Sequence, residues 1–527
     1  MHPPQPGRKS PARHDVDDGD EADDVLSRES IADVETPLLA SDLPPEFVPD
    51  KRFQHTVMMM CCIFVGLVEI YSFLTAAPLQ EIMEDFICHQ HFPDHLMNSP
   101  AIQDQRCKEP GVQKTLAMAR SWWQTLELWI PLLVQLPYGI IADKYGRRPV
   151  IFLSLFGILV EGGLVMFILR HPELFTIWAI VPTPLAYLIG GGSPMATAMV
   201  WTILCDAVPT TERTSAFYLI SALGIVLSAT LNPIAAWLMS MDPWLPMWIG
   251  IVFMALGTLS ALLVPETLRL RKETDAVRRR DPSATDPLLP TDEAQSDERR
   301  VPPKAYVREL LLGARRNTEH IWHFVIGSRD VMLLVAACGF AFPLRTAFED
   351  FILQYTAKRF DWSWSKATYY YTIIKVVALV MLLFVLPVMA KLLARKFGDN
   401  PLRRDLYMAR FSITFIVLAC FFAAAAYVPP VLVISYISYG IGTGFLSQIR
   451  ALATSVVEPH TIATLNTMVS SMETIMGSVG TPAFGWLLGR GIELGGAWQG
   501  LPYLASAVFA LGSCLFVWLF RIPQPFV

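Results

Sequence analysis

Ionisable side chains interrupt several long apolar stretches of the sequence. The candidates are Glu69, Glu127, Arg345, Lys375 and Glu473. A charge near the centre of a lipid bilayer costs about 2.5 to 3.5 kcal/mol, so such residues usually face a polar cavity or a charged partner. A carboxyl group in such a place can bind and release a proton, and a guanidinium group can hold a carboxylate. These residues are therefore candidates for substrate binding and proton coupling.

Each candidate also has a purely structural interpretation. Glu69, Lys375 and Glu473 fall near the middle of their stretches, where a static ion pair between helices would also explain a charge. Arg345 and Glu349 are four residues apart, so they can neutralise each other on one helix face. The two interpretations remain open for each residue.

The composition places these residues in a membrane protein. Hydrophobic residues make up 53% of the 527 residues and charged residues only 17%, whereas a soluble domain has about 25% charged residues. About twelve stretches of some 20 apolar residues are long enough to cross a bilayer, and inside lipid they must be helical. We expect spans at residues 56–78, 119–142, 150–169, 174–205, 214–239, 245–265, 331–356, 366–390, 406–428, 430–452, 461–488 and 501–521.

The two groups of six spans predict the domain organisation. A disordered cytosolic tail (1–54) precedes the first bundle (55–265), a linker (266–330), the second bundle (331–521) and a short tail (522–527). Loops after even-numbered spans are rich in Lys and Arg, which favours a cytosolic position for the linker and both termini. The plasma membrane and the vacuolar membrane are both possible locations.

An internal repeat supports two related halves. Gly190–Gly192 corresponds to Gly440–Gly442 at an offset of 250 residues, and Pro233–Trp237 corresponds to Pro482–Trp486 at an offset of 249. Repeated six-helix halves around a central site are typical of secondary transporters. We therefore expect an all-α membrane protein with twelve transmembrane helices in two pseudo-symmetric bundles.

Several other classes of function are excluded by what the sequence lacks. It has no Gly-rich nucleotide loop, metal-ligand cluster or nucleophile beside a base. We expect neither an enzyme nor a nucleotide-driven pump, and no cofactor, metal or nucleic acid. Cys88 and Cys107 fall in the long first exofacial loop, where an oxidising environment makes a disulfide plausible.

The loop between the second and third spans carries the most specific motif, Gly139-Ile-Ile-Ala-Asp143-Lys-Tyr-Gly146-Arg147-Arg148-Pro. It resembles the loop signature of the major facilitator superfamily. We expect Gly139 to permit close helix approach and Gly146 to permit a tight turn. Asp143 can pair with an arginine and a helix N-terminus, forming a cytosolic latch. Arg147 and Arg148 serve either this latch or membrane topology.

Four further segments resemble fungal members similar to the haem-carrier and proton-coupled folate transporter branch. They are Gln354–Ser363, Gly442–Phe445, Met472–Ile475 and Leu494–Trp498. We expect a monomeric, proton-coupled carrier of a small organic solute, with uptake by symport. The resemblance assigns Lys375 to substrate or proton coupling and places Glu161 in a scaffold helix, where we expect it to be structural. Export of a fungal metabolite and a non-transporting nutrient sensor remain as alternatives.

Overall fold

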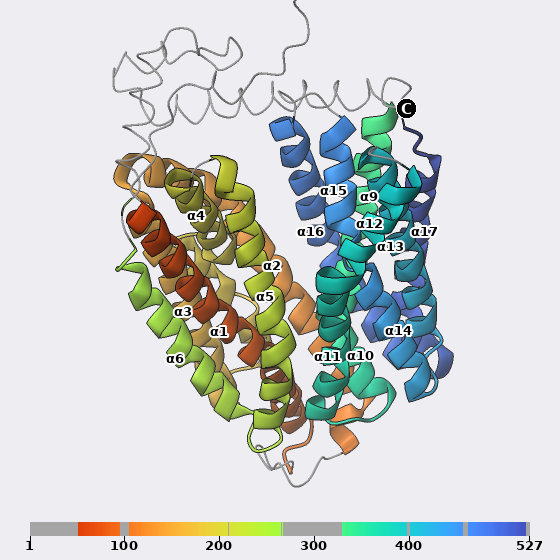
Figure 1. Cartoon of the computed structure of the whole chain (residues 1–527). Coiled ribbons are helices and arrows are strands. Elements are labelled where there is room, and N and C mark those ends of the chain that lie inside the picture. Colours follow the sequence, from red (N-terminus) through yellow and green to blue (C-terminus); the bar gives the residue numbers. More distant parts are fainter. Residues whose placement is uncertain are drawn as a thin grey trace, which may run out of the picture. The chain divides into compact units, whose positions relative to one another are not determined.

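The computed structural model describes residues 51–94, 105–208, 210–264, 266, 329–397, 401–456 and 462–522. Nearly all of the predicted N-terminal tail and linker, and most of the C-terminal tail, lie outside these ranges. Every regular element in the described ranges is a helix, in two groups of six spans (Figure 1). The predicted fold class is therefore confirmed.

The first bundle has one main helix for each span. Its helices are α1 (Lys51–His91), α2 (Pro110–Tyr145), α3 (Arg147–Arg170), α4 (Gly192–Ala207), α5 (Thr210–Met239) and α6 (Trp244–Ala261). Helix α1 has 41 residues, about 60 Å of helix, so it extends well past the predicted span 56–78. The end of the bundles at which α1 ends and α2 begins is called the disulfide end here. The opposite end, at which α1 begins and α6 ends, is called the linker end.

The second bundle contains two spans that pass through a π-helical turn. One consists of α9 (Arg329–Thr346), η6 (Ala347–Phe351) and α10 (Ile352–Arg359), and the other of α11 (Trp364–Val380), η7 (Met381–Val385) and α12 (Leu386–Phe397). The remaining helices are α13 (Pro401–Ala424), α14 (Pro429–Gly442), α15 (Phe445–Val456), α16 (Ile462–Leu494) and α17 (Leu501–Leu519). Within the described residues, nine helical stretches are long and apolar enough to cross a membrane.

The fourth span of each bundle differs from the continuous helix that we expected. Residues 174–205 form two short 3-10 helices, η2 (Ile177–Ile180) and η3 (Thr183–Leu188), before α4 begins. Prolines and three successive glycines with positive φ prevent an unbroken helix there. The corresponding span 430–452 breaks after Gly442, between α14 and α15.

Both breaks bring a glycine against the third span of its own bundle. A Cβ on Gly190 would lie 2.2 Å from the backbone of Leu153 in α3, and a Cβ on Gly442 would lie 2.4 Å from the side chain of Ile416 in α13. Only glycine allows this approach. The two glycines come from the matched segments but not from matched positions, because the repeat pairs Gly190 with Gly440, and a Cβ on Gly440 would lie 2.7 Å from Val377 of α11.

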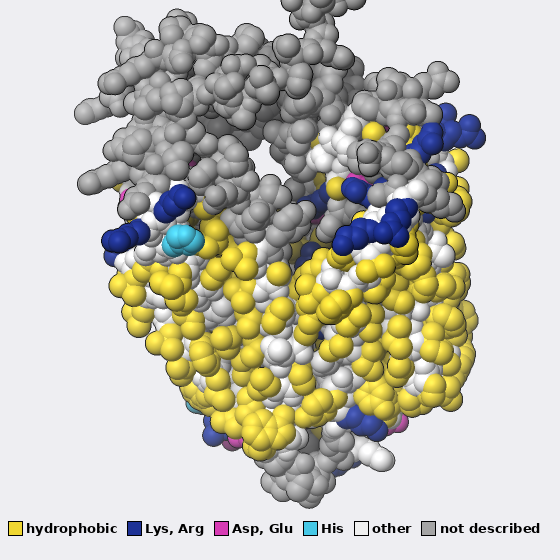
Figure 2. All heavy atoms as spheres, in the orientation of Figure 1, with side chains coloured by type: hydrophobic (Ala, Val, Ile, Leu, Met, Phe, Trp, Pro, Cys, Tyr) yellow, Lys and Arg dark blue, Asp and Glu magenta, His cyan; other side chains and the backbone are white. Residues whose placement is uncertain are grey.

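Apolar packing also joins the bundles at the disulfide end. One buried cluster contains Ile82, Phe86 and Leu116 of the first bundle together with Leu353 and Trp364 of the second. Elsewhere, large apolar side chains cover the outer faces of the helices (Figure 2). Such a surface is stable in lipid, and the chain is a multi-pass membrane protein.

Candidate functional site

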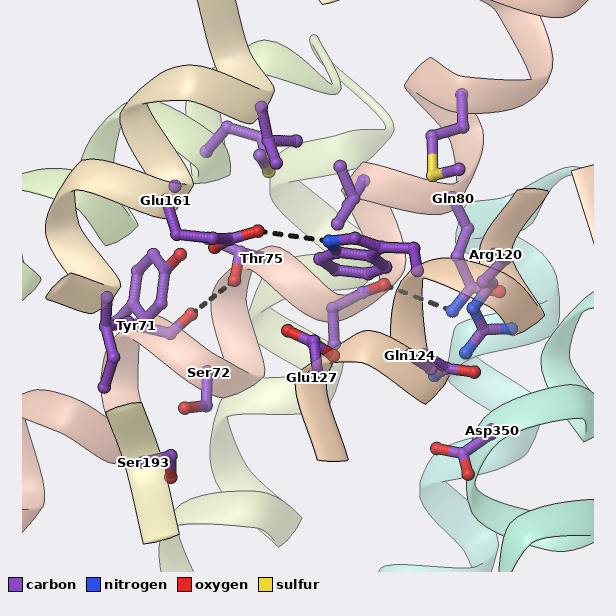
Figure 3. A pocket seen from close by; sticks show the side chains of 18 of the residues that line it. Tyr71, Ser72, Thr75, Gln80, Arg120, Gln124, Glu127, Glu161, Ser193 and Asp350 are labelled. Carbon is purple, nitrogen blue, oxygen red and sulfur yellow. Dashed lines mark hydrogen bonds between the residues drawn. The ribbon is translucent and has the colours of Figure 1, made fainter. Parts of the chain in front are cut away.

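A cavity of about 340 Å³ lies among α1, α2, α3 and α6 and reaches η6 of the second bundle. Its polar lining consists of Tyr71, Ser72, Thr75, Gln80, Arg120, Trp123, Gln124, Glu127, Glu161, Tyr187, Ser193, Glu349 and Asp350. Many of these side chains point into one space (Figure 3). A volume of this size is at the lower end of the range for small-molecule sites.

Two carboxyl groups lie near each other at one part of the cavity. Glu127 accepts a hydrogen bond of 3.0 Å from the hydroxyl of Tyr187. Glu161 accepts bonds of 3.2 Å from the indole N–H of Trp123 and from the hydroxyl of Thr183. The two carboxyl groups also interact electrostatically with each other. We predicted Glu127 as a site residue, whereas Glu161 was expected to be structural.

Arg120 and Asp350 lie at another part of the same cavity (Figure 3). The Arg120 side chain is only 6% exposed, and its Nη1 atom has no hydrogen-bond partner within the described residues. The guanidinium group lies 5.6 Å from the ring centre of Phe351. The sequence interpretation missed Arg120 because it placed the residue at the edge of a span, whereas α2 already begins at Pro110.

Two predicted cations gather around Glu349. Arg345 forms an ion pair of 2.9 Å with Glu349, which is the i, i+4 pairing that the spacing suggested. Lys375 interacts electrostatically with Glu349, and its Nζ atom lies 5.3 Å from the ring centre of Tyr371. Since Glu349 also lines the cavity, the structure brings Arg345, Lys375 and Glu127 to one region.

The other two predicted charges are elsewhere. Glu473 forms an ion pair with Arg450 of α15 within the second bundle. Glu69 faces α5, where a Cβ on Gly224 would lie 4.0 Å from its carboxylate. Neither residue is among those that line the cavity.

The loop motif forms contacts that only partly match the expected ones. Gly146 has a φ of 116°, so it does provide the expected tight turn. The carboxylate of Glu266 accepts hydrogen bonds of 3.1 and 3.2 Å from the backbone N–H groups of Arg147 and Arg148 at the start of α3. A Cβ on Gly139 would meet nothing within 4 Å, so the expected close helix approach there is wrong.

The arginine at the centre of the motif is paired across the first bundle. Arg147 is 1% exposed and lies 3.3 Å from Asp206 of α4. The side chain of Asp143 lies outside the described part of the structure. Neither Asp206 nor Glu266 was predicted as a partner, because the sequence does not show which helix ends meet.

Several polar contacts hold the two bundles together at the disulfide end. Glu84 accepts hydrogen bonds from the indole of Trp364 and the amide of Gln113, and pairs with Lys108 at 2.8 Å. Gln354 donates a bond of 2.9 Å to the Gln113 carbonyl.

The disulfide lies beside these contacts. Cys88 and Cys107 are joined, with Cα atoms 5.1 Å apart, and the Cys107 carbonyl accepts a bond of 3.0 Å from Gln113. A more exposed pair of 2.5 Å joins Lys114 of α2 to Glu493 of α16.

Comparisons with known proteins agree with this architecture. An Emericella nidulans protein named MFS efflux pump atnC is 24% identical over 496 residues, covering 91% of this chain and 90% of that protein. The Aspergillus flavus protein named efflux pump ustT is 25% identical over 481 residues, covering 88% and 90%. The crystal structure of a D-xylose-proton symporter aligns with a TM-score of 0.56 at 15% identity, covering 89% of this chain and 98% of that one.

These relatives do not support the narrower resemblance to the haem-carrier and proton-coupled folate transporter branch, so that expectation is dropped. The family model of the Major Facilitator Superfamily matches residues 59–481, most of both bundles. The chain therefore belongs to the Major Facilitator Superfamily and is a membrane transporter, not an enzyme.

Proposed function

We propose that this transporter exports a small organic solute by alternating access and that protons moving in the opposite direction drive the export. The observation that carries the proposal is the pair of neighbouring carboxyl groups on the wall of the cavity, buried Glu161 and half-buried Glu127. The export direction is supported by the relatives named as efflux pumps.

The carboxyl pair suits proton exchange for an electrostatic reason. Two neighbouring negative charges in a site of low dielectric constant repel each other and lose hydration, and one bound proton relieves both costs. A solute that enters the cavity displaces this proton or changes its environment. Glu127 and Glu161 then act as the coupling residues, and the Arg345–Glu349–Lys375 group supplies charge on the side of the second bundle.

The contacts at the disulfide end supply the gate of the proposed cycle. We place the linker end in the cytosol, following the basic loops, so the Glu84 and Lys114 contacts close the exofacial side. Opening to the outside requires the bonds to Trp364 and Glu493 to break. The protein works as a monomer in this proposal, in the plasma membrane or the vacuolar membrane.

The experiment has two stages. Metabolites inside and outside cells are compared with and without the gene, and a solute that accumulates inside the deletion strain is then followed in inside-out vesicles with and without a pH gradient. Acidifying the lumen should increase uptake into these vesicles. Replacing Glu127→Gln or Glu161→Gln should abolish the response to the gradient while leaving solute exchange.

Glu173→Gln is the matched control, because this exposed carboxylate lies in the turn after α3, away from the cavity. If solute flux through the unmodified protein does not depend on the pH gradient, the proposed proton coupling is wrong. Flux for no solute would favour a sensor, and flux in the opposite direction would favour uptake.

A further inference from the structure

The charged groups of the cavity are distributed unevenly. Arg120 lies with Gln80, Gln124 and Asp350 on one side, and Glu161 lies with Tyr71 on the other (Figure 3). Glu127 projects between the two sides in this view. A solute that fills the cavity therefore meets Arg120, with Asp350 on the same side, at one end and Glu161 at the other end.

The Arg120 side needs a hydrogen-bond acceptor. The Nη1 atom of this buried guanidinium has no hydrogen-bond partner, and Asp350 shares the cavity without forming an ion pair with it among the described residues. A buried charged donor without a partner is costly, and a carboxylate is the acceptor that best matches the planar guanidinium. This end is thus suited to a carboxylate of the solute.

The other side is suited to an ammonium group. Glu127 and Glu161 supply negative charge, and the rings of Tyr71, Trp123 and Tyr187 surround them on the cavity wall. Aromatic faces attract cations, most strongly where water is excluded. The same carboxyl groups hold the proton in the proposed cycle, so an ammonium group and a proton would compete for one position.

We propose that the cavity selects a dipolar solute, with a carboxylate held by Arg120 and an ammonium group held by Glu127 and Glu161. A solute with only one charge leaves one end of the cavity unpaired, and an unpaired buried charge opposes binding. This inference rests on the proposed function and names its substrate class.

Three probes of similar shape test the inference. Tryptophan carries both charges, tryptamine only the ammonium group, and indole-3-propionate only the carboxylate. Binding of each to the purified full-length protein is measured by titration calorimetry without a membrane or a pH gradient. Tryptophan should bind at least about tenfold more tightly than either analogue, since one charge-assisted hydrogen bond is worth about that factor or more.

Variants should change the preference selectively. Arg120→Gln should remove the advantage of tryptophan over tryptamine, and Glu127→Gln with Glu161→Gln should remove its advantage over indole-3-propionate. Arg148→Gln is the control, because Arg148 is exposed and lies outside the cavity. Since the comparison of the three probes needs only the unmodified protein, it remains decisive if a variant fails to fold.

Equal binding of tryptophan and tryptamine would overturn the role of Arg120, and equal binding of tryptophan and indole-3-propionate would overturn the role of the carboxyl pair. Failure of all three probes to bind would overturn the inference as a whole. Binding with the expected preference but flux without proton dependence would leave the inference standing and contradict only the proposed function. Proton-driven export by a protein that does not prefer tryptophan over the two analogues would contradict the inference and leave the proposed function standing.

Discussion

The strength of the gate at the disulfide end should depend on one buried carboxylate. Glu84 is 6% exposed and holds the indole of Trp364, whose side chain is 1% exposed, across the junction of the bundles. A hydrogen bond to a charged group contributes about 1.5 to 3 kcal/mol. Glu84→Gln keeps a neutral acceptor, so the loss is the difference from a neutral hydrogen bond, about 1 to 1.5 kcal/mol, and opening of this end should become about 5-fold to 12-fold more favourable.

The exposed ion pair at the same end is the matched comparison. Lys114 and Glu493 have side chains that are 41% and 31% exposed, and such pairs contribute about 0 to 1 kcal/mol. Glu493→Gln should therefore favour opening by no more than about fivefold. Both variants remove one negative charge at the disulfide end, so the difference between their effects on opening reports the burial of the Glu84 contact and not the change in net charge.

Spin labels can report the opening directly. Gly111 in the first turn of α2 has open space around it, and Ala497 is an exposed residue after α16. Cysteines at these two positions, labelled and measured by electron–electron double resonance, should show a longer distance in a larger fraction of molecules for Glu84→Gln. Single-cysteine proteins measure labelling of the native thiols. Equal opening by both variants, or more opening by Glu493→Gln, would refute the reasoning.

Three further predictions concern stability and can be checked by the melting temperature of the purified protein. Gly190→Ala should lower the free energy of unfolding by about 2 to 5 kcal/mol, because φ is 87° and the new Cβ meets backbone atoms. Gly139→Ala, at a helical site with open space, should leave the free energy of unfolding unchanged or raise it by up to about 1 kcal/mol. An equal loss of stability in both variants would contradict the packing described around Gly190. Arg147→Met should lower the free energy of unfolding by about 3 to 5 kcal/mol because it removes the buried ion pair with Asp206, and exposed Arg148→Gln should change it by less than about 0.5 kcal/mol. Replacing Cys88 and Cys107 by serine should lower the free energy of unfolding by about 3 kcal/mol, as expected for a disulfide that joins residues 19 positions apart. An unchanged melting temperature would mean that the disulfide does not constrain the unfolded chain.

The sequence predicted the fold well because its main signal is local. A stretch of about twenty apolar residues is recognised without knowledge of its neighbours in space, so most spans were placed within several residues, although α1 extends well past its predicted end and α2 begins well before its predicted start. The exceptions have local causes as well. The fourth span was taken as one helix because its residues are apolar, but Pro182, Pro184 and the glycines at 190–192 break it into separate turns.

The site was harder to predict because its contacts are not local. A charge in an apolar stretch indicates that a partner exists but not which one, as with Glu473, whose partner Arg450 comes from another helix. Arg120 was overlooked because hydropathy alone placed the start of its span too late, at residue 119, although Pro110 is a good first residue for a helix. Glu161 was assigned a structural role, yet it lies on the cavity wall beside Glu127.

The second bundle contributes to the cavity through an irregular turn. Glu349 and Asp350 are neighbours in the π-helical turn η6, and both line the cavity although successive residues of an α-helix point about 100° apart. A π-turn changes the helical phase locally and often lies at a functional site. Glu349 is held by Arg345, whereas Asp350 lies opposite Arg120 of the first bundle. In the proposed mode of binding, a solute that pairs with Arg120 would change the electrostatic interaction of Arg120 with Asp350, which would link occupancy of the cavity to relative movement of the bundles.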